Sequence, residues 1–157
     1  ADVIQIAQGQ RKAPNLVSIL KNRRITKLFH YGRFDIAVLY NAFGVMAEPV
    51  YCTKIASRLT RTYTDRHGLK DLCSELIGVS LSKVQQSSDW AAETLSPEQL
   101  EYAASDVLYL HQLRDKLVLR LTRENRMKEA EACFRFLPTR AKLDLMGWAE
   151  EDIFAHS

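Results

Sequence analysis

Tyr102 and Asp106 lie four residues apart in the stretch 97–110, which has the pattern of a helix. Ser96 is a favoured N-cap residue, and Pro97 suits the first helical position. Residues four apart share one face of a helix, so the tyrosine and the aspartate are expected side by side. A carboxylate at the edge of an apolar stripe is costly unless a positive group faces it. The pair therefore belongs either to a metal site or to an ordinary surface ion pair.

Asp35 is a second candidate ligand, because it follows an expected strand and stands among apolar residues. Such a position leaves little room for an idle solvated charge. The alternative is an acidic residue at a helix N-terminus that faces the helix dipole. Two carboxylates from distant helices, Asp35 and Asp106, would begin a divalent-cation site. Two are too few for a two-metal centre, which needs more negative charge to stay occupied.

The elements that must position these residues alternate between strands and helices, which is typical of an α/β domain. Strands are expected at residues 1–7, 25–30 and 49–53. Helices are expected at residues 15–22, 34–43, 53–60, 69–77 and 97–123, with a further segment through 134. In the long helix an apolar stripe has Tyr102 and Asp106 along a half-buried edge. Its members are Leu100, Ala103, Val107, Leu110, Leu117 and Leu121.

Length and composition fit one globular domain, since 46% of the 157 residues are hydrophobic. With no apolar run of membrane-spanning length and no leader pattern, a cytoplasmic protein without a membrane partner is expected. The net charge of +3 is too small to indicate a nucleic-acid partner by itself. The three cysteines lack CxxC spacing and are expected to be reduced core residues. They are Cys52, Cys73 and Cys133.

Two motifs resemble those of the DEDD 3′–5′ exonucleases and occur in the order found in that family. Residues 29–39, Phe-His-Tyr-Gly-Arg-Phe-Asp-Ile-Ala-Val-Leu, are similar to the second exonuclease motif. Residues 83–90, Lys-Val-Gln-Gln-Ser-Ser-Asp-Trp, followed by Gln99, Tyr102, Ala103 and Asp106, are similar to the third. The tyrosine is typical of the branch that includes ribonuclease D. Departures at Tyr31 and Glu93-Thr94, with segments 58–69 and 147–154, resemble the alphaproteobacterial nanoRNase C group.

The resemblance implies a ribonuclease H-like exonuclease fold, in which a mixed sheet is flanked by helices. It also implies a metal-dependent 3′–5′ exoribonuclease that releases nucleoside 5′-monophosphates from short RNA. Two divalent cations, Mg or Mn, would occupy each site when the full-length chain is present, with Asp35 and Asp106 among the ligands. Because free tyrosine has a pKa of about 10, Tyr102 would orient the attacking water rather than take its proton.

Further residues are expected to bind short RNA or single-stranded nucleic acid. Three follow the end of the second strand, where they could stack on a base or bond to it. Others lie in a basic segment that suits phosphate contacts or is simply a solvated helix end and loop. Two belong to the third motif. The set is His30, Tyr31, Arg33, Arg61, Arg66, His67, Lys83 and Gln86. Trp90 is expected to pack, and His111 and His156 to be structural or solvated.

The first motif of the family, Asp-x-Glu on a central strand, is absent from this sequence. We therefore expect residues 1–157 to form one exonuclease domain that is incomplete at its N-terminus, without the strands that carry this motif. Residues 124–157 are rich in apolar side chains and are expected to form an oligomer interface. The resemblance implies an octameric ring. Two other functions remain open, an inactive or truncated nucleic-acid-binding module and a structural α/β subunit.

Overall fold

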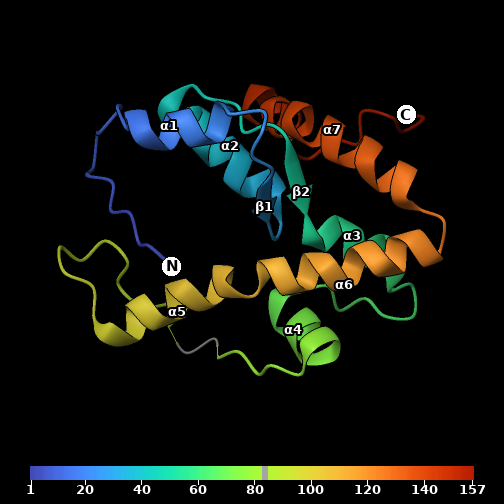
Figure 1. Ribbon diagram of the computed structural model, residues 1–157. Helices are drawn as coiled ribbons and strands as arrows, with labels where there is room; N and C mark the ends of the chain where they lie inside the picture. Colours follow the sequence, from blue (N-terminus) through green and yellow to red (C-terminus); the bar gives the residue numbers. More distant parts are fainter. Residues whose placement is uncertain (83–84) are drawn as a thin grey trace.

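Two short parallel strands lie at the centre of the fold (Figure 1). In the computed structural model, which describes residues 1–82 and 85–157, β1 (Lys27–Phe29) pairs with β2 (Val50–Cys52). The chain between the strands forms a helix, the connection that parallel strands require. The helices are α1 (Pro14–Lys21), α2 (Gly32–Phe43), α3 (Thr53–Thr60), α4 (Leu69–Ile77), α5 (Pro97–Leu108), α6 (Leu110–Arg123) and α7 (Met127–Leu143), with a π-helical turn, η1 (Asp144–Trp148). The predicted α/β class is confirmed.

The strands lie between two groups of helices. Helix α2 packs against α7, and both contact the strands, while α6 packs against α3 and α4 and also touches β1 (Figure 1). Large apolar side chains without solvent exposure fill the space between these elements, and burying each contributes about 1.5–3 kcal/mol. They include Ile36, Leu72, Leu113, Leu117 and Leu121. Among the described helices, none is both long and apolar enough for a bilayer crossing.

The strand predicted at residues 1–7 is wrong, because this segment has no regular structure and its side chains are exposed. A strand needs a neighbour to pair its backbone N–H and C=O groups. In the part of the chain that the structure describes, only β1 and β2 form a sheet, and neither pairs with this segment. Alternation of Val3, Ile4 and Ile6 with polar residues was therefore an insufficient signal.

The single helix predicted at residues 97–123 is interrupted at Tyr109. The backbone N–H of Tyr109 bonds to the carbonyl of Val107, which breaks the regular helical ladder between α5 and α6. The apolar stripe also divides here. Its second half, in α6, is buried, whereas Leu100 and Val107 in α5 are 42% and 49% exposed. The predicted half-buried edge therefore lies beside a partly open surface.

The remaining predicted elements at residues 15–22, 25–30, 34–43, 49–53, 53–60 and 69–77 are confirmed with small shifts of their ends. Helix α7 continues past the predicted end at residue 134, since Phe134 and Leu137 pack in the core. All three cysteines are free, and Cys52 and Cys73 are buried as predicted. Cys133 lies on the outer face of α7 and is exposed. The prediction that it is a core residue is therefore wrong.

Candidate active site

Asp35 lies in the first turn of α2, immediately after the end of β1. The turn between them requires Tyr31 in the left-handed region, with φ 63°, and a close approach at Gly32. A side chain at Gly32 would place its Cβ 3.0 Å from the Cβ of Phe29. Burial, together with the negative charge of Asp106, raises the pKa of Asp35 to about 6. The local sequence thus holds a carboxylate where its charge is unfavourable without a cation.

Tyr102 and Asp106 lie on α5, whose start is fixed by a complete capping box. Ser96 accepts a bond from the backbone N–H of Gln99, and the Gln99 side chain accepts one from the Ser96 N–H. Burial raises the pKa of Asp106, and burial with the charge of Asp106 raises the pKa of Tyr102. The tyrosine is therefore a neutral hydroxyl near neutral pH, beside a carboxylate.

The segment of the third motif is anchored to this helix start. The Gln99 amide donates to the Ser88 hydroxyl at 3.1 Å and to the Asp89 carbonyl at 3.0 Å. The Trp90 ring lies 5.8 Å from the Tyr102 ring, between centroids, and its N–H donates to the Gln85 carbonyl. Trp90 thus packs as predicted, although 38% of it remains exposed. Gln99 belongs to the third motif, but its anchoring role is not evident from the sequence.

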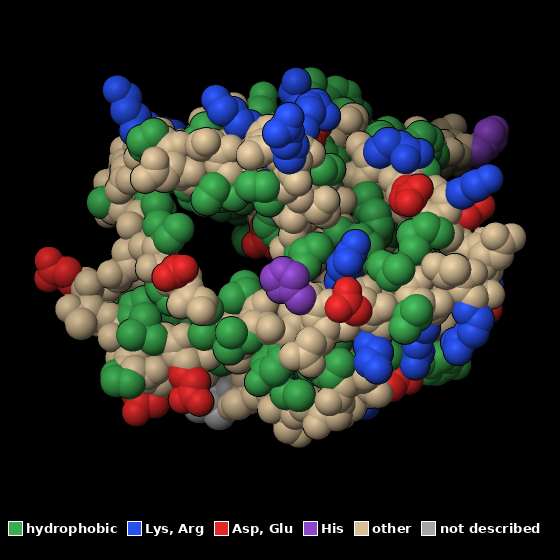
Figure 2. All heavy atoms as spheres, viewed as in Figure 1, with side chains coloured by type: hydrophobic (Ala, Val, Ile, Leu, Met, Phe, Trp, Pro, Cys, Tyr) green, Lys and Arg blue, Asp and Glu red, His purple; other side chains and the backbone are tan. Residues whose placement is uncertain are grey.

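Asp35, Tyr102 and Asp106 line one cavity of about 560 Å³ between β1, α2, α4 and α5. Figure 2 shows a deep hollow between the part formed by α1 and α2 and the part formed by α5, with acidic atoms visible inside it. The cavity therefore brings together the three residues that sequence reasoning assigned to catalysis. Its other polar lining residues include His30, Lys54, Lys70, Ser82 and Gln86.

The carboxylate oxygens of Asp35 and Asp106 are hard ligands, which suit Mg²⁺ or Mn²⁺ in kind. Their raised pKa values indicate that opposite charge at this position would be stabilising. Among the described residues, however, no three His, Cys, Asp or Glu side chains gather as a metal site. Asp35 and Asp106 thus fit a divalent cation as a partial ligand set.

His30 is held at the wall of the cavity by Thr53. The Thr53 hydroxyl donates to the Phe29 carbonyl at 3.2 Å, so it accepts from the His30 Nδ1–H at 2.9 Å. Nε2 is buried without a hydrogen-bond partner in the described part of the chain. The backbone of His67 acts to raise the pKa of His30. Burial outweighs this effect and, with Lys54, lowers the pKa to about 4. His30 is therefore a neutral residue at the site.

Tyr31 and Arg33 do not line this cavity. Tyr31 is exposed, with the Lys54 ammonium 4.6 Å from its ring centroid. Arg33 forms a two-pronged ion pair with Asp144 and also donates to the Ala149 carbonyl. The guanidinium is thus occupied by the C-terminal part of the chain, and its predicted contact with substrate has no support in the geometry.

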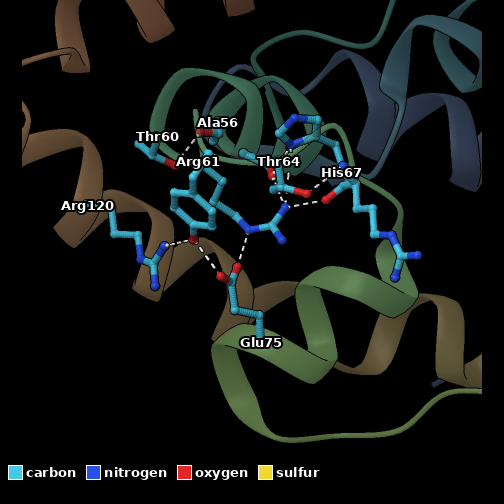
Figure 3. Close-up of polar contacts among 10 residues, drawn as sticks. Ala56, Thr60, Arg61, Thr64, His67, Glu75 and Arg120 are labelled. Atoms are coloured by element: carbon cyan, nitrogen blue, oxygen red, sulfur yellow. Dashed lines mark hydrogen bonds and ion pairs between the residues drawn. The ribbon is translucent and has the colours of Figure 1, made fainter.

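Arg61 and His67 are buried in a polar network and do not line the cavity (Figure 3). The Arg61 guanidinium pairs with Glu75, donates to the Ser57 hydroxyl at 3.0 Å and contacts the Arg66 carbonyl. The same Ser57 hydroxyl lies 2.7 Å from Nδ1 of His67. Since Arg61 is only 3% exposed, this geometry corrects its predicted phosphate contact. The three-way bonding favours a structural role for Arg61 and His67.

The other predicted residues divide between the cavity and the surface. Gln86 lines the cavity, whereas Arg66 is exposed outside it. Lys83 lies outside the described residues. His111 and His156 are exposed, as one of the two predicted alternatives has it. Sequence reasoning missed Lys54, although it follows the end of β2, and the carboxyl ends of parallel strands meet at one edge where ligands bind.

Residues 1–122 match the model of a family of 3′-5′ exonucleases. The chain belongs to the 3′-5′ exonuclease family. Ribonuclease D of Acidiphilium cryptum is 37% identical over 121 residues, which are 77% of this chain and 30% of the relative. The chain thus spans about three tenths of the length of the curated ribonucleases D that it matches.

Solved structures of exonucleases share the fold and confirm the predicted ribonuclease H-like class. Brucella melitensis NrnC is 73% identical, with a TM-score of 0.95, and the match covers 98% of this chain and 74% of NrnC. Other structures of that protein contain bound Mg²⁺ or pGG. Escherichia coli RNase D is 31% identical, with a TM-score of 0.73, and the match covers 81% of this chain and 34% of RNase D. The predicted resemblance to ribonuclease D and the nanoRNase C group is confirmed.

Proposed function

We propose that this exonuclease is a metal-dependent 3′–5′ exoribonuclease that degrades short oligoribonucleotides to nucleoside 5′-monophosphates. The observation that carries the proposal is the convergence of Asp35, Tyr102 and Asp106 on one cavity, with both carboxylates at raised pKa. Mg²⁺ in the NrnC structure and the oxygen ligands here support a divalent cation, and two per site is the number that the family resemblance implies. Bound cations would activate water and stabilise negative charge on the phosphate.

The chain's own residues divide the remaining work. Asp35 and Asp106 would supply part of the ligand set that holds the cations. Tyr102 keeps its proton near neutral pH, so its hydroxyl orients the attacking water without acting as a strong base. Its position four residues before Asp106 keeps the hydroxyl on the same helix face as the ligand. Because water is partly excluded from the cavity, each of these electrostatic interactions is stronger than it would be in solvent.

Short RNA as the substrate rests on two observations. A solved structure of NrnC contains bound pGG, and the cavity here combines carboxylates with Lys54 and Lys70, which can meet backbone phosphates. His30 and Gln86 are placed to contact a base or sugar at the same wall. Tyr31 and Arg66, which are exposed outside the cavity, remain in the proposal only as outer contacts, and Lys83 remains a contact predicted from the sequence. A non-catalytic binding module would keep the lysines but would have no need for Tyr102 beside Asp106.

We also propose a homo-oligomer, an octameric ring by family resemblance, whose interface includes residues 124–157. Large apolar side chains are exposed along the end of this segment, which favours burial against another subunit. They are Leu145, Met146, Trp148, Ile153 and Phe154. Light scattering of the full-length protein at micromolar concentration should give the mass of an oligomer. A monomeric mass would remove this part of the proposal.

The function is tested by incubating the full-length protein with 5′-labelled short RNAs and Mg²⁺. Stepwise shortening from the 3′ end, release of nucleoside 5′-monophosphates and arrest by EDTA are expected. An RNA blocked by a 3′-phosphate should resist, and Asp106→Asn should abolish shortening. RNA binding without shortening would favour the binding module, and neither binding nor shortening would favour the structural subunit.

A further inference from the structure

The first turn of α2, which presents Asp35, has little local support. Its N-cap residue, Tyr31, makes no side-chain capping bond and has a left-handed backbone. The Gly32 N–H reaches only the Cys52 sulfur, at 3.4 Å, and such bonds to sulfur are weak. A helix start without a cap tends to fray unless an outside group holds it. The position of Asp35 therefore depends on contacts from other elements.

Arg33 supplies such a contact from the same helical turn. Its Nε lies 2.6 Å from Oδ2 of Asp144, and its Nη2 lies 2.8 Å from Oδ1. Two parallel bonds of this kind fix the orientation of the guanidinium as well as its distance. Nη2 also donates to the Ala149 carbonyl at 2.9 Å. Arg33 thus ties the turn that carries Asp35 to the C-terminal part of the chain.

Asp144 is itself held in place by a second arginine. Nε of Arg140 lies 3.1 Å from Oδ1 of Asp144, and the same guanidinium donates to the Trp148 and Glu151 carbonyls. The side chains of Asp144 and Arg140 are mostly buried, at 16% and 13% exposure. This arrangement is a rigid anchor on the end of α7, and α7 packs along α2.

We propose that Asp144 is a positioning residue of the active site, which acts through Arg33 to hold Asp35 in place for its cation. The inference rests on the proposed function. Arg33 was expected from the sequence to contact substrate, but its guanidinium faces the C-terminal segment and does not line the cavity. Asp144 is far from the motifs in sequence, so neither motif contains a signal for it.

The test compares full-length Asp144→Asn and Arg33→Lys with the wild type, and uses Glu48→Gln as the matched control. Glu48 pairs with the exposed Arg23 and lies outside the cavity. Asp144→Asn should lower kcat by about 10- to 100-fold with little change in KM, because misplaced catalytic groups have such costs. Arg33→Lys, which keeps the charge but not the paired bonds, should fall between Asp144→Asn and the wild type.

Two readouts do not depend on turnover. In metal-free protein, hydrogen exchange in peptides covering residues 29–38 should be faster in Asp144→Asn than in the wild type. Mn²⁺ affinity, measured by electron paramagnetic resonance, should also fall, whereas Glu48→Gln should leave both unchanged. These two results would stand even if the wild type failed to degrade RNA, so failure of the proposed function can be distinguished from failure of this inference.

Two results would overturn the positioning role. A lower melting temperature with unchanged kcat, Mn²⁺ affinity and exchange at residues 29–38 would make the cluster merely structural. A rise in KM alone would mean that Arg33 contacts substrate directly, as the sequence suggested.

Discussion

The cavity around Asp35 and Asp106 differs from the network around Arg61 in whether its charged groups have partners of opposite charge. In the network, every named polar group has a partner, since Arg61 meets Glu75 and Ser57, and Tyr63 bridges Glu75 and Arg120 (Figure 3). In the cavity, burial raises the pKa of both carboxylates, and the charge of Asp106 raises the pKa of Asp35 further. A buried charge that is already paired belongs to the structure of the fold, whereas a buried charge without a partner marks a candidate ligand-binding site.

The largest effect is expected when a carboxylate of the cavity is neutralised, which tests whether the cavity and the network differ in this way. Asp35→Asn or Asp106→Asn should reduce RNA shortening by at least about 100-fold, because a cation loses a charged ligand. The melting temperature in EDTA should stay the same or rise, since an unfavourable charge is removed. A variant that kept near-normal activity would show that its carboxylate is not part of the site.

Tyr102→Phe should have the next largest effect on activity. Losing the hydroxyl should lower kcat by about 100-fold, the lower range for a group that assists proton transfer, and should spare Mn²⁺ affinity. Tyr63→Phe is the matched control, because that hydroxyl bonds to Glu75 and Arg120 in the network. Single-turnover kinetics would compare the rate of the chemical step in Tyr102→Phe with that in Tyr63→Phe. Equal losses in kcat and in metal affinity would give Tyr102 a structural role.

Arg61→Met should damage the fold rather than the chemistry. The change removes a buried guanidinium, so that Glu75, Ser57 and the Arg66 carbonyl each lose one hydrogen-bond partner, and the free energy of unfolding should fall by about 3 kcal/mol. Activity per folded molecule should persist. Arg23→Ala, at an ion pair whose arginine side chain is 79% exposed, should cost less than about 1 kcal/mol. Urea unfolding measures both, and a stable but inactive Arg61 variant would return Arg61 to the substrate site.

A smaller effect concerns the pH dependence of stability without metal. The folded pKa of Asp35, about 6, is raised, so its contribution is present below the unfolded value of 3.8 and is lost as the pH rises to about 6. The folded pKa of His30, about 4, is lowered, so its contribution is present above 6.5 and is lost as the pH falls to about 4. The two dependences oppose each other. In Asp35→Asn, stability should therefore rise more steeply from pH 4 to 6.5 than in the wild type. Thermal unfolding in EDTA measures this slope, and an equal slope in the two proteins would contradict the prediction.

The sequence predicted the residues that meet at the cavity, Asp35, Tyr102 and Asp106, better than it predicted the places of the basic residues. Tyr102 and Asp106 follow from helical spacing and a marked helix start, and Asp35 follows from its place after a strand and among apolar residues. Arg61 and His67 could not be assigned in this way, because a basic segment looks the same whether its side chains face solvent, substrate or a buried acid. Only the packing of α3, α4 and α6 brings Glu75 to Arg61.

The fold shows the same division between local and distant information. The ranges predicted for helices α1 to α4 from local sequence pattern hold with small shifts of their ends. The segment at residues 1–7 alternates like a strand, but strand formation depends on a neighbour that local pattern does not reveal. The break at Tyr109 likewise depends on tertiary packing, since Tyr109 packs against the core while Leu100 and Val107 remain exposed.

Mn²⁺ binding, followed by electron paramagnetic resonance, tests most directly whether the cavity is a cation site. Full-length wild type, Arg61→Met and the double variant Asp35→Asn/Asp106→Asn would be titrated under conditions in which all three are folded. We expect the wild type and Arg61→Met to bind Mn²⁺ equally and the double variant to have lost the binding. Unchanged Mn²⁺ binding in the double variant would contradict the assignment of Asp35 and Asp106 as cation ligands.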